Sequence, residues 1–214
     1  MCTPFPPWFV SFLKKQKVCS KMSDFILILF GTALVNNIVV IQAIGVDPAL
    51  AYSRKIDVAF GLSCAMLVML PLVTLCGYLI NTWLIIPFNI EYLRLVIFVM
   101  LIIVISFCIK LWFKKINESL NDLIKIFFPY AIINTTVLGT LLLSQQFSGN
   151  IFMSLGYGLG TATGFSIVLV LLTAITERLE AAEVPVAFQG LPILLITLGL
   201  LSMAFLGFTG LVDF

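Results

Sequence analysis

Histidine is absent from the 214 residues, and charged side chains make up only 10% of them. The lack of histidine removes the commonest metal ligand and the usual general base of soluble enzymes. A formal net charge of +2, with no basic run, gives no sign of a nucleic-acid surface. The five cysteines show no C-x-x-C spacing, and Cys64, Cys76 and Cys108 lie inside apolar runs, which favours buried free thiols. These scarcities exclude most soluble enzyme mechanisms.

Apolar residues dominate instead, at 61% of the chain, and the mean hydropathy is +1.17. A soluble domain carries roughly a quarter of its residues as charged side chains, far more than this chain has. Six apolar segments are each long enough to cross a hydrocarbon core of about 30 Å. They lie near residues 25–46, 56–80, 92–113, 123–143, 151–175 and 191–212. The expected fold is an all-α membrane protein with six transmembrane helices.

Residues 1–21 precede the first of these segments and do not resemble a secretory signal, because their lysines follow the short apolar piece. Met22 opens a long apolar run directly. We therefore expect the native chain to start at Met22 and residues 1–21 to be an extension from a misassigned start. The alternative is an aromatic and basic anchor that lies on the membrane surface.

Lysine and arginine fall unevenly along the remaining chain, which predicts its orientation. Those in or beside the loops after segments one, three and five are Arg54, Lys55, Lys110, Lys114, Lys115, Lys125 and Arg178. With a start at Met22, the other side holds only Arg94. Because positive residues favour the cytoplasm, both termini are expected on the periplasmic side of a bacterial inner membrane.

Two adjacent amides, Asn36 and Asn37, interrupt the first apolar segment, which then stops at Gly45 and Pro48. An unsatisfied amide in lipid costs on the order of several kcal/mol, so both side chains should face protein or a broken backbone. Segment four repeats this theme with Asn134. The two stretches are interpreted as a matched pair.

An internal repeat supports that pairing. An offset of 97 or 98 residues aligns Asn36 with Asn134, Gly61 with Gly158, Pro87 with Pro185 and Leu93 with Leu191. Each half holds three spans, and because three is odd, the second half enters the membrane from the opposite side. The sequence thus predicts two inverted three-helix repeats, 22–120 and 121–214, with Asn36, Asn37 and Asn134 meeting near the bilayer centre.

Segment five carries Gly156, Gly158, Gly160 and Gly164 among small polar residues. Small residues let a second helix approach closely, so this face is expected to serve helix packing. The acidic and basic residues around Arg178, in the loop after this segment, are interpreted as a solvated surface or a docking face for a soluble partner. No catalytic residue and no metal-ligand set is evident in the sequence.

Several motifs resemble the Rnf/Nqr family of membrane subunits (NqrDE/RnfAE). They are Leu34-Val35-Asn36-Asn37, Thr82-Trp83-x-x-x-Pro87, Asn134-x-x-Val137-Leu138-Gly139, Val184-Pro185-x-x-Phe188 and Ala204-Phe205-x-Gly207-Phe208-x-Gly210. The resemblance covers residues 22–214, and the last two motifs fit the A-type branch better than its E-type paralogue. In that family, Asn36, Asn37, Gly45, Pro48, Asn134 and Gly139 belong to the helices that cross at the midplane.

The resemblance implies a membrane component of a complex that couples electron transfer between NADH and ferredoxin to Na⁺ or H⁺ translocation. Its partners would be the paralogous E-type six-helix subunit, together with further subunits that carry flavins and iron–sulfur centres. Such a component is not expected to be catalytic alone. A stand-alone transporter and an assembly scaffold without electron transfer are the alternatives that the sequence leaves open.

One departure from the family concerns its cofactor. The resemblance implies a [2Fe–2S] cluster shared by the paired subunits, with two cysteines from each. The matching positions here are Asp47 and Thr135. Iron–sulfur clusters are held by soft thiolates, and a threonine hydroxyl is a poor ligand. We expect the fold to be kept and the electron site to be altered.

Overall fold

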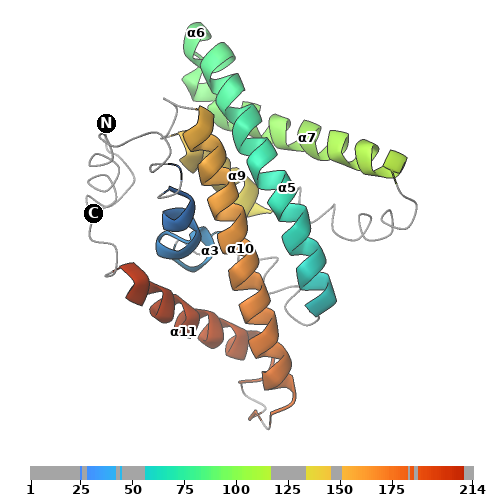
Figure 1. Ribbon diagram of the computed structural model, residues 1–214, viewed down its shortest axis with the longest axis vertical. Coiled ribbons are helices and arrows are strands. Elements are labelled where there is room, and N and C mark those ends of the chain that lie inside the picture. The colour runs from blue at the N-terminus through green and yellow to red at the C-terminus, as the bar shows by residue number, and fades with distance from the viewer. Residues whose placement is uncertain are drawn as a thin grey trace.

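A computed structural model describes residues 25, 28–41, 44, 56–116, 134–145, 151–182, 184–185 and 188–209. Within these ranges the regular structure is helical throughout, which confirms the predicted all-α class. The longer helices are α5 (Ile56–Ile80), α7 (Arg94–Ile116), α10 (Ile151–Glu180) and α11 (Leu191–Thr209) (Figure 1). The shorter ones are α3 (Ile38–Ile41), α6 (Ile86–Phe88) and α9 (Thr135–Ser144). Residues 1–21 lie outside the described ranges.

Three helices are long and apolar enough to cross a membrane, namely Ala59–Phe88, Glu91–Leu111 and Ile151–Leu179. They correspond to the second, third and fifth segments expected from the sequence. The sixth segment forms the shorter apolar helix Leu191–Gly207, and the fourth is described from Asn134 onward. The first segment is a broken helix, because its regular hydrogen bonding stops at the two asparagines.

α5 and α10 form the centre of the molecule and run in opposite directions (Figure 1). Their close approach depends on Gly158, since a Cβ there would lie 3.1 Å from the Cα of Pro71 and 3.2 Å from the carbonyl oxygen of Leu70. The Ser154 hydroxyl donates to the carbonyl of Thr74 at 3.3 Å across the same interface. The helix contact is therefore close enough for backbone atoms to meet.

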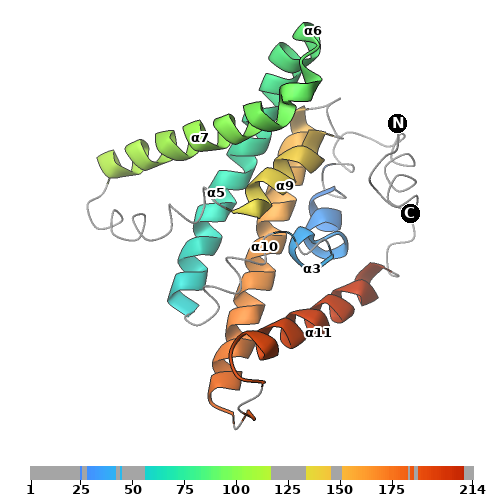
Figure 2. The ribbon, with the colours of Figure 1, turned by 180° about the vertical axis from the view of Figure 1, so that it is seen from behind.

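The remaining helices surround this pair in a related way. α7 leaves one end of α5 toward one side, and α11 leaves the opposite end of α10 toward the other side (Figure 1). α3 packs against α10 and α11, whereas α9 packs against α5 and α7 and lies between α5 and α10 when seen from behind (Figure 2). Each first helix thus contacts the second and third helices of the other half, as an inverted repeat requires.

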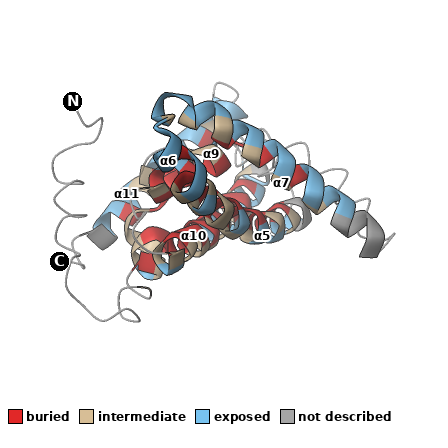
Figure 3. Cartoon of the chain, turned by 90° about the horizontal axis from the view of Figure 1, so that it is seen from above, coloured by how far each residue is buried: buried red, intermediate tan, exposed pale blue. Residues whose placement is uncertain are grey.

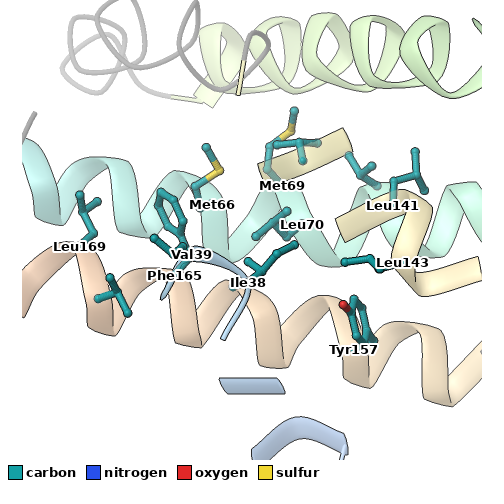
Figure 4. Packing of buried hydrophobic residues seen from close by; sticks show 14 of the residues in the cluster. Ile38, Val39, Met66, Met69, Leu70, Leu141, Leu143, Tyr157, Phe165 and Leu169 are labelled. Carbon is teal, nitrogen blue, oxygen red and sulfur yellow. The ribbon is translucent and has the colours of Figure 1, made fainter. Parts of the chain in front are cut away.

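The core lies where α3, α5, α9 and α10 meet. Figure 4 shows Ile38, Met66, Leu70, Leu141 and Phe165 from these four helices in one apolar cluster, and each of them is almost completely buried. The outer faces of α6, α7 and α11 are largely exposed (Figure 3). Their exposed side chains are mostly large and apolar, as expected for helices that face lipid or a partner protein.

Candidate functional site

The first polar break follows a short π-helix, η1 (Gly31–Val35). The Asn36 backbone leaves the helix at φ −116° and ψ 51°, and α3 begins two residues later. The Asn37 side chain bridges the gap, because its Oδ1 accepts from the Val39 N–H at 3.1 Å and its Nδ2 donates to the carbonyl of Ala33 at 3.0 Å. Asn37 therefore caps α3 and ties it to the preceding turn.

The second break has the same local chemistry. Asn134 is extended, at φ −73° and ψ 119°, and its Oδ1 accepts from the N–H of Thr136 at 2.9 Å. It is the N-cap of α9, just as Asn37 is the N-cap of α3. In local structure the counterpart of Asn134 is thus Asn37, at an offset of 97 residues. The alignment of Asn36 with Asn134 is shifted by one residue from this equivalence.

Each capping amide lies against the long helix of the opposite half. The Nδ2 of Asn134 is 3.7 Å from the Sδ of Met66, near the middle of α5. The Nδ2 of Asn37 lies 2.8 Å from where a Cβ on Gly164 would stand, near the middle of α10. Both asparagines are buried, so the amides lie deep in the bundle at corresponding positions of the two halves.

The two broken segments also touch each other. A Cβ on Gly139 of α9 would lie 2.9 Å from Cγ2 of Ile44 and 3.6 Å from Cδ1 of Ile38. The N–H of Ile44 in turn donates to the Ile38 carbonyl at 3.2 Å, which closes the end of α3. Gly139 therefore belongs to the contact between the two halves. Gly45, Asp47 and Pro48 lie outside the described residues.

A glycine stripe on α10 holds the first broken segment in place. Gly156, Gly160 and Gly164 recur every four residues and face the side of the first helix that carries Phe25, Leu29, Ala33 and Asn37. A Cβ on Gly160 would stand 2.7 Å from the Leu29 carbonyl oxygen, and one on Gly164 would stand 2.8 Å from that of Ala33. The predicted packing role of this small-residue face is confirmed.

α11 makes a second attachment to the broken segment. The Ser202 hydroxyl donates to the carbonyl of Val40 at 2.9 Å. α3 is only four residues long, so its last carbonyls lack partners within the helix. Ser202 supplies one partner and connects the last helix of the chain to the first.

Thr135 follows Asn134 as the first residue of α9, and it is exposed although its neighbour is buried. The next hydroxyl, that of Thr136, is buried without a hydrogen-bond partner in the described part of the chain. The midpoint of the bundle thus presents a polar helix end toward the outside of this chain.

The described cysteines do not meet at this point. Cys64 and Cys108 are exposed and Cys76 is half-buried, so the expectation of buried thiols is wrong for the first two. They lie on the outward faces of α5 and α7, where apolar character does not require burial within the chain. Cys64 and Cys76 are also separated by 12 residues of one helix, or about 18 Å. Among the described residues, no group of three or more cysteines or acids could hold a metal ion.

Fold and site together define a polytopic all-α membrane protein with two capped helix breaks packed against its central helices. The chain belongs to the family of Rnf-Nqr subunits, which are membrane proteins, because the family model matches residues 25–212. A relative from Pseudoalteromonas translucida, named as the A-type component of the ion-translocating oxidoreductase complex, is 44% identical over 90% of this chain and 100% of its own. Relatives of the same name from Glaesserella parasuis and Shigella boydii are 44% and 42% identical over 89% of this chain and 99% of theirs.

Proposed function

We propose that this chain is the A-type membrane component of an ion-translocating oxidoreductase complex, which couples electron transfer between NADH and ferredoxin to Na⁺ or H⁺ translocation. The relatives that match almost end to end carry the corresponding name. The observation that carries the proposal is the pair of breaks at Asn37 and Asn134, each buried against the long helix of the other half. Discontinuous helices in inverted halves are typical of proteins that move ions across membranes.

The exposed start of α9 supports a partner protein in the membrane. Polar groups at a helix end cost several kcal/mol where they face hydrocarbon, so another polypeptide should cover Thr135 near the bilayer centre. The paralogous E-type subunit, built from the same six-helix plan, is the partner we propose. Such a pair would place two sets of broken helices face to face, within a larger assembly that also carries flavin and iron–sulfur subunits.

We further propose that this chain contributes no pair of ligands to a [2Fe–2S] cluster. Thr135 offers a hydroxyl where the family pattern has a thiolate, and Asp47 offers a carboxylate. The cysteines of α5 cannot substitute together, because about 18 Å separates them. The donor set therefore does not fit the cluster, and the role left to this chain is to shape the midplane crossing.

The location we propose is a bacterial inner membrane, with both termini on the periplasmic side. Arg178 is exposed at the end of α10, in keeping with a cytoplasmic position for that loop. The halves would be 22–120 and 121–214, entering the membrane from opposite sides. No catalytic residue is assigned to this chain, since the redox chemistry would belong to the partners.

Affinity purification of the tagged full-length chain from native membranes tests the proposed function. We expect a stable complex that contains flavin-bearing and iron–sulfur-bearing subunits together with a second six-helix protein. Vesicles made from that complex should move cations when electrons are supplied. A chain that purifies alone and transports a solute without a redox partner would overturn the proposal in favour of a transporter. A complex without redox subunits would favour a scaffold.

A further inference from the structure

A second π-helix, η2 (Asn81–Ile85), extends α5 toward α6. The N–H of Ile86 donates to the carbonyl of Asn81 across this wider turn. Single π-turns within α-helices concentrate at functional sites. Asn81 is only 3% exposed, and its Oδ1 has no hydrogen-bond partner in the described ranges. A buried amide oxygen without a donor is unusual, because nearly all buried polar atoms are paired.

Gln145, at the C-terminal end of α9, carries a second such oxygen. Its Nε2 donates to the Leu141 carbonyl at 3.2 Å and to the Ser144 hydroxyl at 3.3 Å. These contacts fix which end of the amide is nitrogen, since a reversed amide would bring two oxygens together. The remaining atom, Oε1, is buried and has no partner among the described residues.

The two amides belong to one corner of the bundle. A Cβ on Gly77 of α5 would lie 3.5 Å from the Nε2 of Gln145. Asn81 follows Gly77 by four residues, so its side chain stands one helical turn further along the same face. The last carbonyl groups of α9 end at this corner and carry the negative end of the helix dipole. Unpaired oxygens thus approach from both helices.

We propose that the side-chain oxygens of Asn81 and Gln145, with the C-terminal carbonyl groups of α9, form a binding site for Na⁺. Every group at this corner that lacks a partner is a hydrogen-bond acceptor, which a cation satisfies. Residues 59–90 and 134–145 contain no Asp, Glu, Lys or Arg. Neutral oxygens suit a monovalent ion, whereas Ca²⁺ and Mg²⁺ sites use carboxylates. Half-helix C-termini with carbonyl oxygens are known to coordinate Na⁺ in membrane transporters.

The role of this site rests on the proposed function, because a cation site within an ion-translocating complex would be a stopping point for the transported ion. Binding itself does not rest on it. The experiment therefore measures cation-dependent stability in place of transport, so that a chain without redox partners can still show the site.

The purified full-length protein, in whatever assembly it is isolated, is heated in NaCl, KCl or choline chloride of equal ionic strength. We expect the unfolding temperature to rise with NaCl in a saturable manner and to remain low in the other two salts. Asn81→Leu and Gln145→Leu should each abolish the sodium effect. Asn81→Asp should lower the half-saturating Na⁺ concentration by roughly tenfold, because it adds a negative charge at the site.

Thr173→Val is the matched control, since that buried hydroxyl already donates to the Leu169 carbonyl within α10 at 2.8 Å. It should leave the sodium effect unchanged. A wild-type protein that responds equally to all three salts would show that water, and not Na⁺, satisfies the two oxygens. A sodium effect that persists in Asn81→Leu and in Asn81→Asp with the same half-saturation would place the ion elsewhere. Either result overturns the proposal.

Discussion

Gly164→Leu is expected to prevent the first helix from docking on α10, and Gly164→Ala to weaken that contact measurably. A Cβ at this position would stand 2.8 Å from the carbonyl oxygen of Ala33 and 3.0 Å from its Cα. These are backbone atoms, which cannot rotate away as a side chain could. Overpacking of this kind costs roughly 1–3 kcal/mol for a single methyl group. At about 2–4 °C per kcal/mol, the alanine variant should unfold several degrees lower in detergent.

Gly199 of α11 offers the matched control, because no atom lies within 4 Å of where its Cβ would stand. Gly199→Ala should therefore leave the unfolding temperature of the purified chain unchanged or raise it slightly, since alanine favours helix. Equal destabilisation by both alanine variants would mean that the stripe on α10 is not a site of close packing.

Replacing Asp47 and Thr135 together with cysteine is expected to create a [2Fe–2S] centre in the assembled complex. The two substitutions restore thiolates at the positions that match the family pattern, and the paralogous subunit would supply the other two. Iron analysis should show about two additional iron atoms per complex, and low-temperature electron spin resonance should show a new signal on reduction.

Thr135→Ser serves as the control, because it keeps a hydroxyl and should add no iron. The unchanged complex should lack the paired-subunit signal that the double-cysteine variant gains. A signal already present in the unchanged complex, and retained after Asp47→Ala and Thr135→Ala, would mean that other residues hold the cluster. The proposed loss of the ligand pair would then be wrong.

Long apolar segments and close-packing glycines could be predicted from the sequence because their physical causes are local. The 25 residues of α5 and the 30 of α10 each form one helix, since uninterrupted apolar runs of this length have few alternatives in a membrane. The glycine spacing in α10 likewise identified a face for close approach. Polar residues in the first and fourth segments pointed to the breaks for the same reason.

Details that depend on contacts between distant residues could not be predicted. Asn36 and Asn37 are equivalent in a sequence alignment, and only the cap hydrogen bonds distinguish Asn37. Ser202 gave no signal, because its partner is the backbone of Val40, 162 residues away. The exposure of Cys64 and Cys108 was also missed, since hydropathy does not distinguish the inner from the outer face of a membrane helix.

The equivalence of the two breaks is tested most directly by the unfolding temperatures of three variants, Asn36→Ala, Asn37→Ala and Asn134→Ala. Loss of an N-cap costs about 1 kcal/mol, so Asn37→Ala and Asn134→Ala should lower the unfolding temperature by similar amounts of a few degrees. Asn36→Ala should have little effect, because the cap hydrogen bonds of α3 come from the neighbouring side chain. A result in which Asn36→Ala matches Asn134→Ala while Asn37→Ala is neutral would contradict the proposed relation between the halves.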